Sequence, residues 1–231
     1  MDGSNFWKWI HAKCRQSKAA PRFSKHREYT VALPEVQGVG YHAPPVGQCP
    51  MDRQLWSIGH STKSIDEFLA LLQSHGIRRL VDVRTVPRSR HNPQFDTDTL
   101  AQHLKHAKIT YVHQPGLGGL RKPKRDSINA GWKNTSFRGY ADYMQTEPFR
   151  VAIETLMTES RNTPTAIMCA EAVPWRCHRS LIADALAVRG WTVRHILTRT
   201  KADRHRLTPF AVVEHDRITY PPPDPLAAQN S

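Results

Sequence analysis

Short apolar runs alternate with amphipathic stretches between residues 55 and 197. The apolar runs predict buried strands, and the stretches between them repeat apolar residues at helical spacing. Strands that alternate with helices in this way are typical of a mostly parallel sheet. We therefore predict a single α/β domain with a Rossmann-like sheet and helices on both of its faces. The predicted strands are Leu55–Gly59, Arg79–Arg84, Ile109–His113, Thr165–Cys169 and Thr192–Leu197.

Helical stretches connect most of these strands. The first helix should begin after the capping residue Ser64 and end at Gly76. Three others are expected over about residues 98–107, 140–160 and 175–189. Residues 114–136 are rich in Gly and Lys, and a connection of this length is a candidate binding loop.

The two ends of the chain differ in composition from its centre. Residues 1–50 scatter basic residues, Pro and Ser among few apolar residues, so we expect a disordered basic extension. Met51 directly precedes the first predicted strand and is a candidate natural start; the alternative is a basic arm that folds on nucleic acid. The α/β domain is expected over residues 51–220, and a disordered Pro-rich tail over residues 221–231.

The net positive charge of the chain indicates which class of partner it binds. The sequence has 33 Lys and Arg against 20 Asp and Glu, a formal net charge of +13. Such an excess attracts phosphates over a Debye length of about 8 Å, so the predicted partner is a phosphate-bearing small molecule or nucleic acid. The alternative is that basicity serves solubility. Because no apolar run is long enough to span a bilayer or to act as a secretion signal, we expect no membrane partner and a cytoplasmic location.

The four cysteines favour free thiols over a disulfide framework. Two of them, Cys14 and Cys49, lie in the extension, whereas the other two bracket the segment that we predict to be the functional centre. That segment reads Cys169-Ala-Glu-Ala-Val-Pro-Trp-Arg-Cys177-His178-Arg179.

Polar residues gather where the predicted strands end. Ligands bind outside the carboxyl ends of the strands in open α/β sheets, so these residues should face one crevice. The expected substrate-binding residues are His60, Ser61, Arg84, Arg88, Arg90, Arg121, His178 and Arg179.

Cys177 is the candidate nucleophile. Pro174 and the apolar pattern that follows place it in the first turn of a helix, where free N–H groups bind anions. The helix end and Arg179 should lower the pKa of its thiol. The alternative is that Cys177 packs as a small apolar side chain.

The remaining candidate catalytic residues are Glu171, Cys169 and Asp82. Glu171 is a candidate general acid or base. Cys169 ends an apolar strand, so burial is its alternative role, and Asp82 is equally suited to a structural ion pair with Arg84.

The same segment contains side chains that could bind a metal ion. Cys169, Glu171, Cys177 and His178 supply zinc-binding side chains, but adjacent Cys and His are awkward tetrahedral partners and the cysteine spacing is unusual. The cofactor is therefore left open, with zinc as the alternative. Neither a dinucleotide fingerprint nor a phosphate-binding P-loop is present, which argues against nicotinamide and ATP chemistry.

From about Trp56 to Leu197 the chain resembles bacterial proteins of the domain of unknown function 488 family. The resemblance implies a Rossmann-like α/β fold and a polar site at the motif residues, and it carries no activity. The first fifty residues have no counterpart in it. The motifs are Ile58-Gly-His-Ser61, Leu80-Val-Asp-Val-Arg84, Pro87-Arg-Ser-Arg90, Leu117-Gly-Gly-Leu-Arg121, Phe137-Arg-Gly-Tyr-Ala-Asp-Tyr143, Cys169-Ala-Glu171 and Cys177-His-Arg179.

These features favour an enzyme, a hydrolase or transferase, acting on a nucleotide, a nucleic-acid base or another phosphate-bearing substrate. In this hypothesis the arginines bind the anion, and Cys177 or Glu171 carries the reaction. One alternative is a non-catalytic module that binds nucleic acid or nucleotides. A second alternative is a zinc-stabilised protein.

Overall fold

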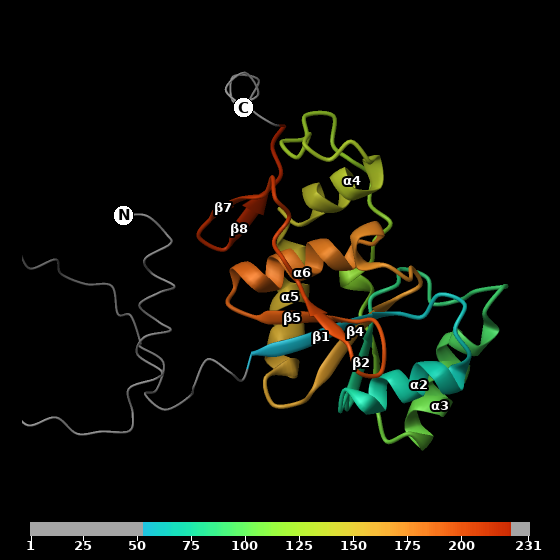
Figure 1. Ribbon diagram of the computed structural model, residues 1–231. Coiled ribbons are helices and arrows are strands. Elements are labelled where there is room, and N and C mark those ends of the chain that lie inside the picture. The colour runs from blue at the N-terminus through green and yellow to red at the C-terminus, as the bar shows by residue number, and fades with distance from the viewer. Residues whose placement is uncertain (1–52, 223–231) are drawn as a thin grey trace, which may run out of the picture. The chain divides into compact units, whose positions relative to one another are not determined.

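The computed structural model describes residues 53–222, so the predicted extension and most of the predicted tail lie outside the described residues. One six-stranded sheet has the order β3-β2-β4-β1-β5-β6, of which β2, β4, β1 and β5 can be followed in Figure 1. Strands β1 to β5 are parallel and β6 is antiparallel, which confirms the predicted mostly parallel α/β fold. The bounds are β1 (Gln54–Gly59), β2 (Arg79–Asp82), β3 (Thr110–His113), β4 (Thr165–Cys169), β5 (Thr192–Ile196) and β6 (Ala202–Arg204).

Helices cover both faces of the sheet, as predicted (Figure 1). Alternate strand residues point to opposite faces, so Leu80 joins one core and its neighbour Val81 the other. The first core is completed by α2 (Ile65–Ser74) and α3 (Thr97–His106). The second is completed by α4 (Thr135–Tyr143), α5 (Glu147–Ser160) and α6 (Arg179–Val188). Within residues 53–222 no helix combines the length and apolar character needed to cross a membrane.

Two predicted helices have different bounds. The helix expected over residues 140–160 is divided into α4 and α5 because Pro148 has no backbone N–H with which to continue the helix from α4, whereas it fits the first turn of a new helix. The helix expected from residue 175 begins at Arg179, after a 3-10 turn over Pro174–Arg176. Cys177 has extended backbone (φ −133°, ψ 145°), so its predicted place in the first helical turn is wrong.

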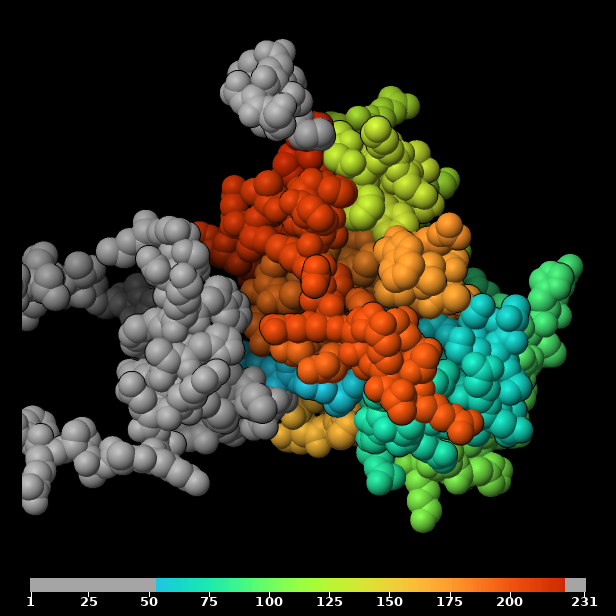
Figure 2. Space-filling model, viewed as in Figure 1, coloured from blue at the N-terminus to red at the C-terminus, as the bar shows by residue number. Residues whose placement is uncertain are grey.

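Three short strands were not predicted. β6 lies at the edge of the sheet, and β7 (Val212–Glu214) pairs with β8 (Arg217–Thr219) in a separate hairpin. The C-terminal segment packs against the segment around α4, from which it is far apart in sequence (Figure 2). Two hydrogen bonds join them, from the Gly131 amide to the Tyr220 carbonyl and from the Tyr220 amide to Asn129 Oδ1.

The connections that leave β1 and β4, two parallel neighbours in the sheet, run toward opposite edges of the sheet. After β1 the chain passes through α2 to β2, on one side of this pair, and after β4 it passes through α6 to β5, on the other side. α2 and α6 cover opposite faces. Such a topological switch opens a crevice at the carboxyl ends of the two strands, which is the usual ligand site of an open α/β sheet.

Candidate active site at the switch point

A cavity of about 440 Å³ lies at this switch point. Its size is within the range of roughly 300–1,000 Å³ that is typical of small-molecule sites. The lining residues come from the segments that follow each of the first four strands. This agrees with the expectation that ligands bind at the carboxyl ends of the strands. They include His60 after β1, Arg84 after β2, Gly119 after β3 and Glu171 after β4.

Two thiols and an imidazole form a cluster on one wall of the cavity. The sulfurs of Cys169 and Cys177 and a ring nitrogen of His178 all lie within 4.8 Å of one another. The distance from Cys177 Sγ to His178 Nδ1 is 3.6 Å, and Arg179 Nε donates to the same sulfur at 3.4 Å. Cys177 is buried and Cys169 is half-buried, and neither forms a disulfide.

The two thiols differ in acidity. A hydrogen bond from Cys169 lowers the pKa of Cys177 well below its usual value, and the charge of Arg179 acts in the same direction. The same hydrogen bond and burial raise the pKa of Cys169. The pair therefore carries its first negative charge on Cys177.

Arg179 is committed to the protein itself. It is 1% exposed, and beyond Cys177 it donates to Ser57 Oγ at 2.9 Å and to the Glu171 carbonyl at 2.5 Å. These contacts hold the Cys177 sulfur and the loop after β4, and Arg179 is absent from the residues that line the cavity, so its role in substrate binding stays a prediction. The loop approaches β1 so closely that a Cβ on Gly59 would lie 2.0 Å from the Glu171 carbonyl oxygen.

Asp82 and Arg84 form a buried ion pair beside the cavity. Asp82 is fully buried and accepts hydrogen bonds from the Arg84 amide, from the Arg84 guanidinium and from Tyr111 Oη. This network matches the structural alternative for Asp82, which does not line the cavity. Arg84 lines it, but Nη2 is occupied by Asp82 and the Phe95 carbonyl, and Nη1 lies 3.4 Å from His60 Nε2.

His60 is held as a neutral imidazole. Burial lowers its pKa to about 4, so the ring is uncharged at neutral pH. Nδ1 lies 2.9 Å from the Ser61 carbonyl and therefore carries the proton, which leaves Nε2 as an acceptor toward Arg84. The ring also stacks on Phe95 at 4.2 Å between centroids. His60 can thus accept a hydrogen bond in the cavity, but its neutral ring offers no positive charge to an anion.

The cationic groups of the cavity are Arg84, Arg88 and Arg176. Within residues 53–222 no hydrogen bond or ion pair occupies the guanidinium of Arg88 or of Arg176. Arg176 was not predicted, although it stands in the predicted functional segment directly before Cys177. Ser61, Arg90 and Arg121 do not line the cavity, and Arg121 instead stacks over the Tyr143 ring at 3.7 Å.

Part of the lining is apolar. Val86, Leu120 and Phe137 form this apolar wall, and Val86 and Leu120 are 60% and 77% exposed. Phe137 packs on Trp132 at 4.7 Å between ring centroids. The cavity therefore offers unpaired positive charge, an apolar surface and a cluster of reactive side chains within one enclosure.

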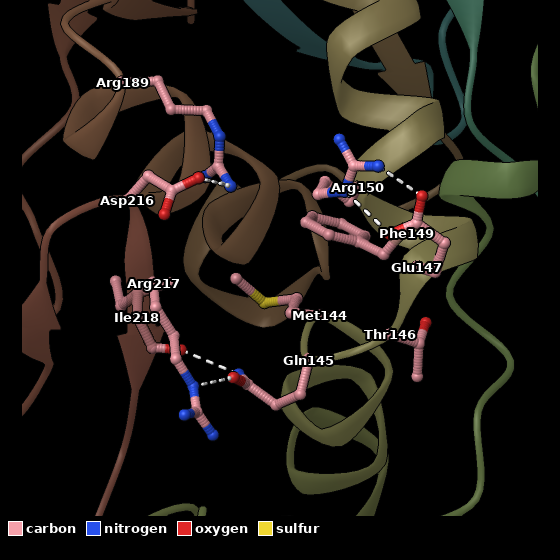
Figure 3. A pocket seen from close by; sticks show the side chains of 10 residues that line it. All are labelled: Met144, Gln145, Thr146, Glu147, Phe149, Arg150, Arg189, Asp216, Arg217 and Ile218. Atoms are coloured by element: carbon pink, nitrogen blue, oxygen red, sulfur yellow. Dashed lines mark hydrogen bonds and ion pairs between the residues drawn. The ribbon is translucent and has the colours of Figure 1, made fainter. Parts of the chain in front are cut away.

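A second, smaller cavity of about 170 Å³ lies between the start of α5 and the β7–β8 hairpin (Figure 3). It also contains three arginines, but each has a partner. Arg150 pairs with Glu147, Arg189 with Asp216, and Arg217 donates to Gln145. No Cys or His lines this cavity, so it lacks the reactive side chains of the first one.

The sequence pattern of the family described as "Domain of unknown function DUF488" matches residues 64–186. The chain belongs to this family. In this DUF488 member the matched residues include β2, β4, both cysteines of the cluster and His178, whereas His60 and Ser61 precede the match. No curated protein and no solved structure matches the chain significantly. The family is defined without a function, so a function has to be argued from the site.

Proposed function

We propose that the protein is a cytoplasmic enzyme, a hydrolase or transferase, that acts on an anionic, phosphate-bearing substrate such as a nucleotide or a nucleic-acid base. One observation carries this proposal. The cavity at the switch point contains Arg88 and Arg176, whose guanidinium groups have no partner among residues 53–222, together with the cluster of Cys169, Cys177 and His178.

The cavity divides the work of binding between two surfaces. A guanidinium offers a planar pair of N–H donors that suits phosphate oxygens, so Arg88 and Arg176 hold the anion. The apolar wall around Phe137 suits the flat face of a base or another apolar group. Size, charge and polarity together favour a nucleotide-sized substrate over a small inorganic anion.

Two reactive side chains, Glu171 and Cys177, also line the cavity. Glu171 is exposed at the cavity and is placed to move a proton, while Cys177 is placed to attack or to hold an attacking group. The buried Arg179 stabilises negative charge on the Cys177 sulfur. A module that only binds nucleic acid has no need for this buried stabilisation, which is why we favour an enzyme over the non-catalytic alternative.

Binding of a nucleoside monophosphate tests the proposal. We expect the double variant R88Q/R176Q to bind at least about tenfold more weakly than the unaltered chain, because a hydrogen bond to a charged group contributes roughly 1.5–3 kcal/mol. Isothermal titration calorimetry at about 50 mM salt measures the affinity, which should fall as salt rises.

Arg199 provides a matched control because it is exposed and does not line either cavity. R199Q removes one positive charge and should leave the affinity nearly unchanged. Equal affinity for R88Q/R176Q and R199Q would show that the anion does not bind at the switch-point cavity.

A further inference from the structure

The cluster of Cys169, Cys177 and His178 has the ligand atoms and the spacing of a metal site. In tetrahedral zinc sites the Zn–S distance is about 2.3 Å and the Zn–N distance about 2.0 Å, which places neighbouring ligand atoms roughly 3.5–3.8 Å apart. Cys177 Sγ and His178 Nδ1 are 3.6 Å apart, and the whole set lies within 4.8 Å. The three groups therefore need only small movements to share one ion.

His178 is oriented for such a role. Its Nε2 lies 3.2 Å from the Val83 carbonyl and donates to it, so that Nδ1 keeps its lone pair and faces the Cys177 sulfur. Metal-binding histidines almost always anchor their second nitrogen in this way. Gly119 keeps the approach open, because a Cβ at this position would lie 2.4 Å from Nδ1.

The adjacency of Cys177 and His178 does not prevent them from sharing an ion. Cys177 is extended, and His178 turns into the helix with φ −56° and ψ −13°. This change of direction is what brings the two side chains of neighbouring residues to one point. Adjacent Cys and His are awkward tetrahedral partners by sequence, yet here the Cys177 sulfur and His178 Nδ1 lie 3.6 Å apart.

We propose that Cys169, Cys177 and His178 bind a zinc ion whose fourth coordination position is open to the switch-point cavity. Two thiolates balance the charge of the ion, and Arg179 Nε is an outer donor to one of them. Borderline-soft zinc suits this set of two sulfurs and one imidazole better than magnesium or calcium, which prefer oxygen ligands.

Three protein ligands and one open position are the arrangement of catalytic zinc sites. This part of the inference rests on the proposed function, because it assigns the fourth position to water that attacks the substrate. That water gives one proton to Glu171 as its oxygen bonds to the electrophilic atom. The proton then passes to the leaving group as the old bond breaks, so hydrolysis consumes one water and requires no other reactant.

Metal content of the purified full-length chain tests the proposal. We expect about one zinc per chain by mass spectrometry of the metal, and intense sulfur-to-cobalt absorption when the zinc-free chain is titrated with Co²⁺. The variants C169S, C177S and H178N should each bind Co²⁺ at least tenfold more weakly. The double variant C14S/C49S should bind it as the unaltered chain does, because the cluster that the structure shows within residues 53–222 is made by Cys169, Cys177 and His178.

A further variant distinguishes loss of metal binding at this cluster from loss of the fold. G119A adds a Cβ against the His178 ring and should weaken Co²⁺ binding, while circular dichroism reports whether each variant keeps its fold. Zinc should also protect Cys169 and Cys177 from iodoacetamide, and a chelator should remove the protection. Binding of Zn²⁺ and Co²⁺ by the unaltered chain that is no tighter than binding by folded C169S would overturn the metal assignment.

Different results would contradict the metal assignment and the proposed substrate class. R88Q/R176Q should keep the zinc while losing nucleotide affinity, because neither arginine belongs to the cluster. Loss of zinc binding with intact nucleotide binding contradicts only the metal site. Intact zinc binding without nucleotide affinity contradicts only the proposed substrate.

Discussion

Asp82 and Arg84 show how burial decides the role of a residue. The sequence places both at the end of a strand, where each is a candidate for chemistry. In the folded chain Asp82 is fully buried and both its oxygens accept hydrogen bonds, so it positions Arg84 against the cavity. Exposure and partners follow from packing between distant segments, and the sequence alone does not reveal them. The same reason explains why Arg176 was missed.

Replacement of Asp82 should therefore destabilise the fold. D82N removes the negative charge and leaves Arg84 buried without its counter-ion, for which we expect a loss of about 3–5 kcal/mol in the free energy of unfolding. Urea denaturation measures this loss. The exposed pair of Arg150 and Glu154 is the control, and E154Q should cost less than about 1 kcal/mol. Similar small losses in both variants would contradict a structural role for Asp82.

Helices and strands could be predicted from the sequence where the pattern of apolar residues extends over several residues. All five parallel strands and the capped helix after Ser64 form close to their predicted bounds. The interruption before Pro148 and the extended Cys177 were missed, because each occupies only a few residues within a helical pattern. β6, β7 and β8 are three residues each, and a segment of this length is too short to show a repeated alternation of apolar and polar residues.

A buried histidine on β5 gives the fold a dependence on pH. His195 Nε2 lies 3.0 Å from His205 Nδ1, and His205 Nε2 lies 2.8 Å from Asp184 Oδ1. Burial, with His205 next in importance, lowers the pKa of His195 to about 3. The unfolded chain binds this proton near the ordinary value of about 6.5. Stability contributed by neutral His195 is thus complete above pH 6.5 and is lost as the pH falls toward 3.

H195Q keeps a donor near the position of Nε2 but cannot take up the proton. Between pH 6.5 and pH 5 the unaltered chain should lose about 2 kcal/mol of unfolding free energy more than H195Q does. Urea denaturation of both proteins at the two pH values measures the difference. The same loss in both would show that His195 does not govern this pH range.

At the scale of the whole molecule, the sequence predicts that the strand ends share one crevice but does not give the order of the strands. That order places β1 beside β4 and so creates the switch point from which the cavity opens. It also brings the loop after β3 to His178, through contacts between segments about sixty residues apart. Several residues named from the sequence line the cavity, such as His60, Arg88 and Cys177, whereas Arg176 was missed and the grouping around one cavity depends on topology.

Binding of the phosphate-bearing ligand in the switch-point cavity can be observed residue by residue, by titrating a nucleoside monophosphate into the ¹⁵N-labelled chain and recording NMR spectra. We expect shifts of the Nε–Hε signals of Arg88 and Arg176 and of the amides of Gly119 and Leu120. Shifts confined to Arg150, Arg189 and Arg217 of the smaller cavity in Figure 3, or no shifts at all, would contradict binding in the switch-point cavity.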